Sequence, residues 1–161
     1  MTIRKLAFTS RQKAESLPGS PNIAVISITD PTTPPAALSL AFTKVLRLSF
    51  FDAIPADEFL PAPLPGLFDY RMARQIVDFV AALQADHAIY EVLVHCEYGV
   101  SRSAAVALFV EAYSGAPLTA REYTYEANQW VLDQLLQLSP SLEIDIPPPS
   151  AAVERRQAQR C

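Results

Sequence analysis

The sequence contains little cysteine, histidine or glycine. Its 161 residues include two cysteines, two histidines and four glycines. Two cysteines, Cys96 and Cys161, are too few for a disulfide framework, which favours a reducing compartment such as the cytoplasm. The cysteines and histidines do not have metal-ligand spacing, so we expect neither a metal site nor another cofactor.

Long apolar runs and excess positive charge are also missing. No stretch of 18 or more apolar residues occurs, so we expect no transmembrane helix, and the N-terminal sequence does not predict a signal peptide. The net charge of −4 argues against a partner that is a nucleic acid or an anionic membrane. Half of the residues are hydrophobic, which is enough for one domain with a sizeable core.

Apolar runs rich in β-branched residues alternate with segments of helical spacing. Strands are predicted at 3–8, 22–28, 44–50 and 91–95, and helices at 10–17, 68–84, 102–113, 119–127 and 128–138. This alternation predicts an α/β fold with a central, mostly parallel sheet of four to five strands flanked by helices.

Two proline-rich segments interrupt or follow this pattern. Residues 53–67 hold four prolines and a glycine and are expected to form a loop. From Pro140 onward the chain becomes polar and proline-rich. We therefore predict one domain over residues 1–140 and a flexible C-terminal tail over residues 141–161.

The most informative stretch is 91–109, which passes from a predicted buried strand through a tight turn into a predicted buried helix. Such a turn aims several backbone N–H groups and the positive end of the helix dipole at one point. That point is an anion site before any side chain is considered. It also lies beyond the carboxyl end of a strand, where ligands bind in parallel sheets.

Four residues strengthen this prediction. The Cys96 thiolate would lie in the positive field at the strand end, and Gly99 permits the positive φ that a loop around an anion needs. Arg102 at the helix start could clamp two phosphate oxygens, and Ser103 could donate a hydrogen bond to the sulfur. Cys96, Arg102 and Ser103 each also have a structural explanation: an inert buried cysteine, a surface or paired arginine, a locally bonded serine. Their combination favours the functional interpretation.

The nine residues of this turn, His95-Cys96-Glu97-Tyr98-Gly99-Val100-Ser101-Arg102-Ser103, resemble the signature of the cysteine-dependent protein phosphatases. The portion from Gly99 to Ser103 is most similar to the dual-specificity branch. This resemblance implies a dual-specificity-phosphatase-like domain in which Cys96 is the nucleophile and Arg102 clamps the phosphate. It further implies that His95 orients the cysteine and that Ser103 helps the thiolate leave. The loop backbone, at Glu97, Tyr98, Gly99, Val100, Ser101 and Arg102, would bind the substrate phosphate.

The family also places an aspartate, the general acid, in a loop after an earlier strand. Asp52 follows the predicted strand 44–50 and would lie at the same sheet edge as Cys96, so we predict that Asp52 is the acid. Asp57 and Glu58, in the following loop, are the alternatives. The proline-rich insert between Asp52 and Cys96 lengthens the spacing of the two residues beyond that expected of compact members of the family.

The function implied is hydrolysis of phosphate monoesters through a cysteinyl-phosphate intermediate. The substrate would be phosphotyrosine or phosphoserine/threonine in a protein, or a small phosphate monoester. One alternative is a rhodanese-like sulfurtransferase, because His-Cys-Glu openings occur in loops that resemble theirs; the five-residue spacing from Cys96 to Arg102 argues against it. A second alternative is a non-catalytic phospho-binding module that keeps the loop but lacks a working acid.

Overall fold

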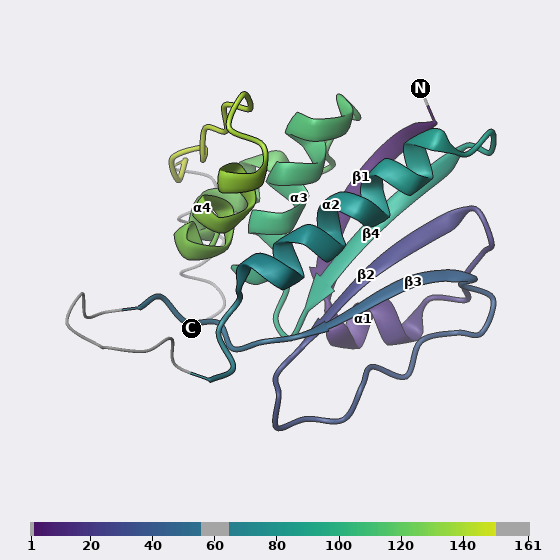
Figure 1. Ribbon diagram of the computed structural model, residues 1–161. Helices are drawn as coiled ribbons and strands as arrows, with labels where there is room; N and C mark the ends of the chain where they lie inside the picture. The colour runs from purple at the N-terminus through teal and green to yellow at the C-terminus, as the bar shows by residue number, and fades with distance from the viewer. Residues whose placement is uncertain (1, 56–64, 151–161) are drawn as a thin grey trace.

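The computed structural model describes residues 2–55 and 65–150 (Figure 1). Strands and helices follow the predicted order closely. In chain order they are β1 (Ile3–Ser10), α1 (Arg11–Ser16), β2 (Ile23–Thr29), β3 (Lys44–Ser49), α2 (Tyr70–Ala85), β4 (Tyr90–Cys96), α3 (Arg102–Ser114), the 3-10 helix η1 (Arg121–Glu126) and α4 (Gln129–Leu138). The segment 119–127, expected to be α-helical, contains only the tighter 3-10 helix η1. None of the described helices is both long enough and apolar enough to span a membrane.

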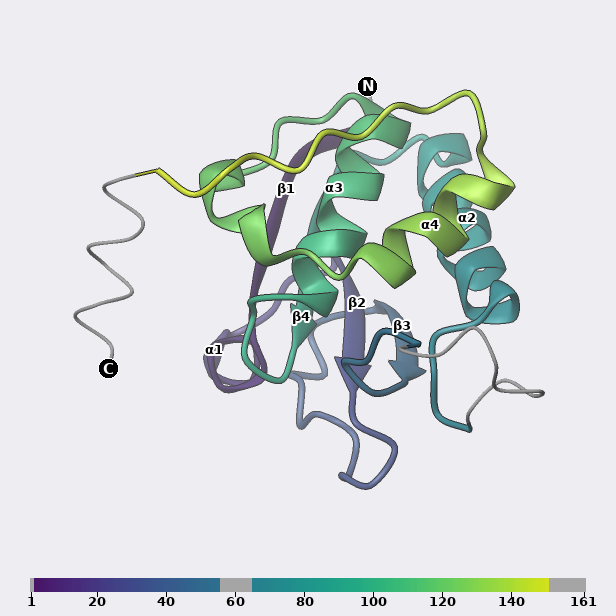
Figure 2. The same ribbon diagram turned by 90° about the vertical axis from the view of Figure 1, so that its left-hand side faces the viewer.

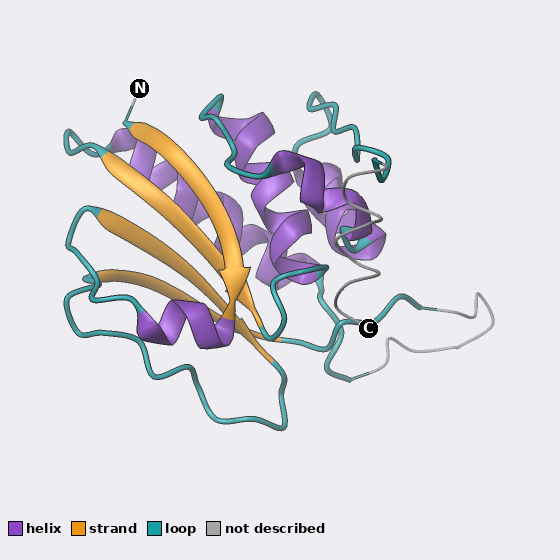
Figure 3. Cartoon of the chain, turned by 180° about the vertical axis from the view of Figure 1, so that it is seen from behind, coloured by secondary structure: helices purple, strands orange, loops and turns teal. Residues whose placement is uncertain are grey.

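The four strands form one parallel sheet in the order β1-β4-β2-β3. This confirms the predicted α/β class and a sheet at the lower end of the predicted strand number. Because all strands run the same way, their carboxyl ends meet at one edge, as Figure 3 shows. The register places Ser10 beside Cys96 and Ser27 beside His95. The predicted nucleophile therefore lies at the edge where ligands bind in such sheets.

Helices cover both faces of the sheet. α2, α3 and α4 lie on one face (Figures 1 and 2), whereas α1 lies alone on the other, the face that Figure 3 shows. Alternate side chains of each strand serve the two layers: Ile26 and Ile28 of β2 join the larger core, and Val25 joins the smaller core with Ala14 of α1. Because both faces of β2 are buried, its sequence is a continuous run of mostly apolar residues.

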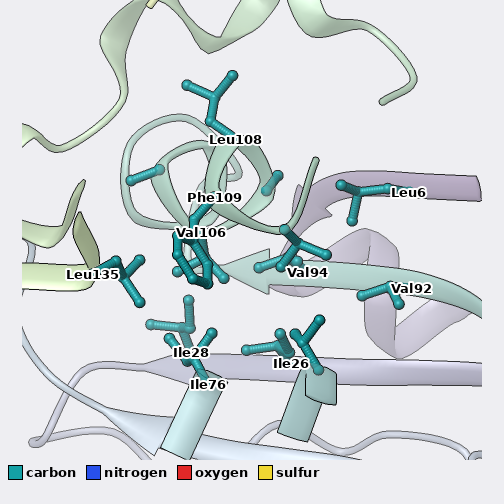
Figure 4. Close-up of a cluster of buried hydrophobic side chains, with 14 of the residues drawn as sticks. Leu6, Ile26, Ile28, Ile76, Val92, Val94, Val106, Leu108, Phe109 and Leu135 are labelled. Atoms are coloured by element: carbon teal, nitrogen blue, oxygen red, sulfur yellow. The ribbon is translucent and has the colours of Figure 1, made fainter. Parts of the chain in front are cut away.

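The larger core is centred on α3, in which every residue from Arg102 to Val110 is buried. Figure 4 shows how Val106 and Phe109 of α3 meet Val94 of β4 and Leu135 of α4. A helix buried on all sides cannot rotate or slide without exposing apolar surface, at about 25 cal/mol per Å². The core thus fixes the N-terminus of α3 relative to the carboxyl end of β4.

Residues beyond the predicted domain boundary also contact this core. Leu142, Ile144 and Ile146 alternate with exposed residues and pack against it as partly buried side chains. The Asp145 carbonyl accepts a hydrogen bond from Arg121 at 2.9 Å. Residues 151–161 of the predicted tail lie outside the described residues, so the division of the chain into domain and tail stays a prediction.

Candidate functional site

The candidate site is the five-residue loop, 97–101, that joins β4 directly to α3. Gly99 in this loop has φ +71°, and a Cβ at this position would lie 2.5 Å from the backbone N of Ser10 and from the carbonyl carbon of Thr9. Only glycine fits this close approach to β1. The Glu97 carbonyl also accepts a hydrogen bond from the Arg11 N–H at 3.3 Å. The loop is therefore held against the start of α1.

The backbone N–H groups of the loop are largely uncommitted. That of Gly99 donates to the Cys96 sulfur at 3.3 Å. Among the described residues, the N–H groups of Glu97, Tyr98, Val100 and Ser101 have no hydrogen-bond partner. Together with the positive end of the α3 dipole, these donors are available to an anion, and the binding of a phosphate by this loop stays a prediction.

Cys96 lies at the bottom of this loop and is 2 % exposed. Its thiol donates a hydrogen bond to the Ser103 hydroxyl at 3.1 Å. A thiolate can only accept, so after deprotonation the hydroxyl would donate to the sulfur instead. The structure thus brings together the sulfur and the serine that the sequence pairs.

His95 is fully buried, and the hydrogen bonds of its ring go to Ser27 and to the Cys96 backbone. Its Nδ1 donates to the Cys96 carbonyl at 3.2 Å, and its Nε2 accepts from the Ser27 hydroxyl at 2.6 Å. Burial lowers the pKa of His95 below its usual value, and the hydrogen bond to the Cys96 carbonyl opposes this shift only in part. A neutral His95 therefore ties β4 to β2 and can orient Cys96 only through the backbone.

Arg102 is 3 % exposed, and two acceptors bind one end of its guanidinium. Nη1 donates to Oδ1 of Asp30 at 2.6 Å and to the Phe50 carbonyl at 2.7 Å. Nε is buried and has no hydrogen-bond partner among the described residues. A buried, unpaired donor is costly, so this edge of the guanidinium is the part of Arg102 suited to binding an oxyanion.

Asp52 lies beside the loop, at the sheet edge expected from the sequence. Its Oδ1 accepts hydrogen bonds from the Ser101 hydroxyl and from Nδ2 of Asn128, each at 2.8 Å. Asp52 is exposed. The alternative acids, Asp57 and Glu58, lie outside the described residues.

The side chains of Glu97 and Tyr98 have different surroundings. An Oε2 atom of Glu97 lies 3.7 Å from Nη1 of Arg11, a contact that offsets the negative charge which the loop would otherwise bring near a phosphate. Tyr98 is 81 % exposed. The predicted contribution of both residues to substrate binding therefore rests on their backbone.

Two residues of the site were not predicted. Asp30 directly follows β2, and an acidic residue at the carboxyl end of a central strand was a signal that could have marked it. Asn128 directly precedes the apolar pattern of α4 and could have been predicted as a helix N-cap. Its contact with Asp52, 76 residues away, has no signal in the local sequence.

No family model and no curated protein matches the chain. Solved structures do match it. Human DUSP28 is 17 % identical with a TM-score of 0.40 over 95 % of this chain and 94 % of that one. A human tyrosine phosphatase-like serine/threonine/tyrosine-interacting protein is 18 % identical, with a TM-score of 0.39 over 86 % and 77 %. Tk-PTP in its active form is 15 % identical, with a TM-score of 0.41 over 99 % and 92 %.

Proposed function

We propose that the protein hydrolyses phosphate monoesters, of phosphorylated proteins or small molecules, in a reducing compartment such as the cytoplasm. One observation carries the proposal. A cysteine, a guanidinium edge and a carboxyl group surround one loop, and among the described residues the guanidinium Nε and all but one of the loop N–H groups have no hydrogen-bond partner. Nucleophile, charge stabilisation and acid are the three parts that the reaction needs.

In the first step Cys96 reacts as the thiolate, having lost its proton to solvent beforehand, and its sulfur forms a bond to phosphorus. Loop N–H groups and the Arg102 guanidinium stabilise the charge on the three non-bridging oxygens. The bond from phosphorus to the ester oxygen breaks, and the Asp52 carboxyl gives its proton to that oxygen. The products are a cysteinyl-phosphate, the free alcohol or phenol, and the Asp52 carboxylate.

In the second step water attacks the phosphorus of the cysteinyl-phosphate. The Asp52 carboxylate accepts a proton from the water, and the bond from phosphorus to sulfur breaks. The Ser103 hydroxyl stabilises the departing thiolate by donating to it, 3.1 Å away. Inorganic phosphate leaves, and the site returns to its starting protonation state.

The test is phosphate release from an aryl phosphate by the purified full chain. We expect turnover by the wild type, none by Cys96→Ser, and retained binding of vanadate by that variant. Cys161→Ser, which changes the other cysteine of the sequence, is the matched control and should keep wild-type turnover. Normal turnover by Cys96→Ser would remove the nucleophile assignment.

Two other results would decide for the alternatives. Vanadate binding without turnover by the wild type would favour a phospho-binding module. Transfer of sulfur from thiosulfate to cyanide, lost in Cys96→Ser, would favour a sulfurtransferase, in which the same cysteine carries a persulfide.

A further inference from the structure

The two oxygens of the Asp52 carboxyl have different surroundings. Oδ1 accepts two hydrogen bonds, from the Ser101 hydroxyl and from Nδ2 of Asn128, both at 2.8 Å. Oδ2 has no hydrogen-bond partner among the described residues. An oxygen that accepts two donors is a poor place for a proton, so a protonated Asp52 would carry its proton on Oδ2.

Hydrogen bonds fix the orientation of the Asn128 side chain, and with it the direction in which its amide group donates. The residue is 4 % exposed, its backbone N–H donates to the Ser101 carbonyl at 3.1 Å, and its Oδ1 accepts from the Val131 N–H at 3.1 Å as the N-cap of α4. Because an N–H group can only be met by the amide oxygen, Nδ2 of Asn128 must face the opposite way. It faces Oδ1 of Asp52 and the Ala53 carbonyl.

Ser101 provides the second hydrogen-bond donor to Asp52, and its side chain does not take the capping role that is common at this position. It is the residue before α3, where a serine usually caps the helix by accepting from an N–H of the first turn. Here Ser101 makes no such side-chain bond, and its hydroxyl donates to Asp52 instead. Such departures from a local preference mark functional positions.

We propose that Asn128 and Ser101 are positioning residues for the general acid. They bind Oδ1 of Asp52 so that Oδ2 carries the proton that is transferred to the leaving group. This inference rests on the proposed phosphatase function, and it adds two residues that act through Asp52 rather than on the substrate. In the transfer, the bond between Oδ2 and its proton breaks, the ester oxygen gains the proton, and Asp52 keeps the electron pair.

The experiment compares two aryl phosphates, one with a poor leaving group, phenyl phosphate, and one with a good leaving group, a dinitrophenyl phosphate. A general acid contributes about 10²–10⁴-fold when the leaving group needs a proton. We expect Asn128→Ser and Ser101→Ala to lower kcat for phenyl phosphate about ten- to a hundredfold. The kcat for the dinitrophenyl ester should change less than about threefold.

The variants are chosen to separate positioning from folding. Asn128→Ser keeps a residue that caps α4 well but removes the amide donor. Ser101→Ala loses no cap, so it decides alone if Asn128→Ser fails to fold. Asp69→Ala is the matched control: it removes the side-chain cap of α2, whose Oδ1 accepts from the Met72 N–H at 3.0 Å, without touching Asp52. It should lower the melting temperature and leave the ratio of the two kcat values unchanged.

A double-mutant comparison completes the test. In an Asp52→Asn background, Asn128→Ser should cost no further kcat for phenyl phosphate, because the acid it positions is gone. An equal loss for both esters, or a further loss in the Asp52→Asn background, would overturn the positioning role while leaving the phosphatase assignment intact. No turnover of either ester by the wild type would overturn the proposed function, and with it this inference.

Discussion

Nη1 of Arg102 lies 2.6 Å from Oδ1 of Asp30, in an ion pair that joins the first residue of α3 to the residue directly after β2. The side chain of Arg102 is 4 % exposed and that of Asp30 is 29 % exposed. Asp30 and the Phe50 carbonyl bind the same nitrogen, Nη1, whereas Nε has no hydrogen-bond partner in residues 2–55 and 65–150. The contact therefore decides which edge of the guanidinium is free.

Removing this carboxylate should weaken oxyanion binding. Asp30→Ala leaves Nη1 with the Phe50 carbonyl alone, so the guanidinium can turn away from the loop. We expect the affinity for vanadate to fall about tenfold or more, and the free energy of unfolding to fall by about 1.5–3 kcal/mol, the usual worth of a hydrogen bond to a charged group. Equilibrium titration and urea denaturation measure the two effects.

A surface ion pair provides the control for this variant. Glu91 pairs with the exposed Arg4, so Glu91→Ala should change the stability by less than about 1 kcal/mol and leave vanadate binding as in the wild type. Wild-type vanadate affinity in Asp30→Ala would show that Arg102 does not need Asp30 to face the loop.

Gly99 should tolerate no side chain. An alanine there would combine a left-handed backbone, worth about 1–2 kcal/mol, with a Cβ 2.5 Å from backbone atoms of Thr9 and Ser10. We expect Gly99→Ala to lower stability by more than about 2 kcal/mol and to abolish vanadate binding.

Gly19 is the matched control: its φ is +80°, but its nearest contacts are side-chain atoms of Ser39 and Ala41 at 3.0–3.1 Å. Gly19→Ala should cost the backbone preference and a small shift of these two side chains, and an equal loss in both variants would argue against the backbone clash at Gly99.

Most of the fold could be predicted because its signals are local. The apolar run 22–28 becomes β2 (Ile23–Thr29), and the helical spacing of 68–84 becomes α2 (Tyr70–Ala85). Burial of both faces of the sheet selects such runs, and burial of one face of α2 selects its spacing. The same applies to the loop, because the identity of Gly99 depends on a backbone conformation that the strand-turn-helix order already implies.

The contacts that organise the site could not be predicted in this way. The pairs Asp30 with Arg102 and Asn128 with Asp52 join residues 72 and 76 positions apart. A side chain that bonds a distant partner needs only the correct polar atom in the correct place, and this leaves no periodic pattern in the chain. Asp52 is predicted as the acid because the resembled family has an aspartate after an earlier strand, and Asp52 follows a strand at the sheet edge of Cys96, which is a topological rather than a pairwise argument.

His95 should make the stability fall in mild acid. Burial lowers the pKa of folded His95, whereas in the unfolded chain a histidine has a pKa of about 6.5. The unfolded state thus binds a proton that the folded state does not, so the contribution of neutral His95 is complete above about pH 6.5 and is lost as the pH falls toward the folded pKa. The loss should approach at most about 1.4 kcal/mol per pH unit.

Urea denaturation between pH 7.5 and 5 measures this slope. His95→Gln should be less stable at pH 7.5, because the bond to Ser27 at 2.6 Å is disturbed, yet its stability should depend less on pH. His87, the other histidine, is exposed, so His87→Gln should keep the wild-type slope. An unchanged slope in His95→Gln would assign the acid sensitivity to other groups.

Ser103 should act on the second chemical step only. Its hydroxyl lies 3.1 Å from the Cys96 sulfur, on a fully buried side chain, and can donate to the thiolate that leaves the cysteinyl-phosphate. A donor to a leaving anion is worth about 2–4 kcal/mol in comparable sites, so Ser103→Ala should slow hydrolysis of the intermediate about 10²-fold or more. Formation of the intermediate should be nearly unaffected.

With a good aryl leaving group, rapid mixing should then show a burst of phenol equal to the enzyme concentration, followed by slow turnover. Ser114→Ala, at the far end of α3 where the hydroxyl binds the Val110 carbonyl at 2.7 Å, should show wild-type kinetics. A loss of kcat without a burst in Ser103→Ala would mean that the serine assists the attack of the sulfur rather than its departure.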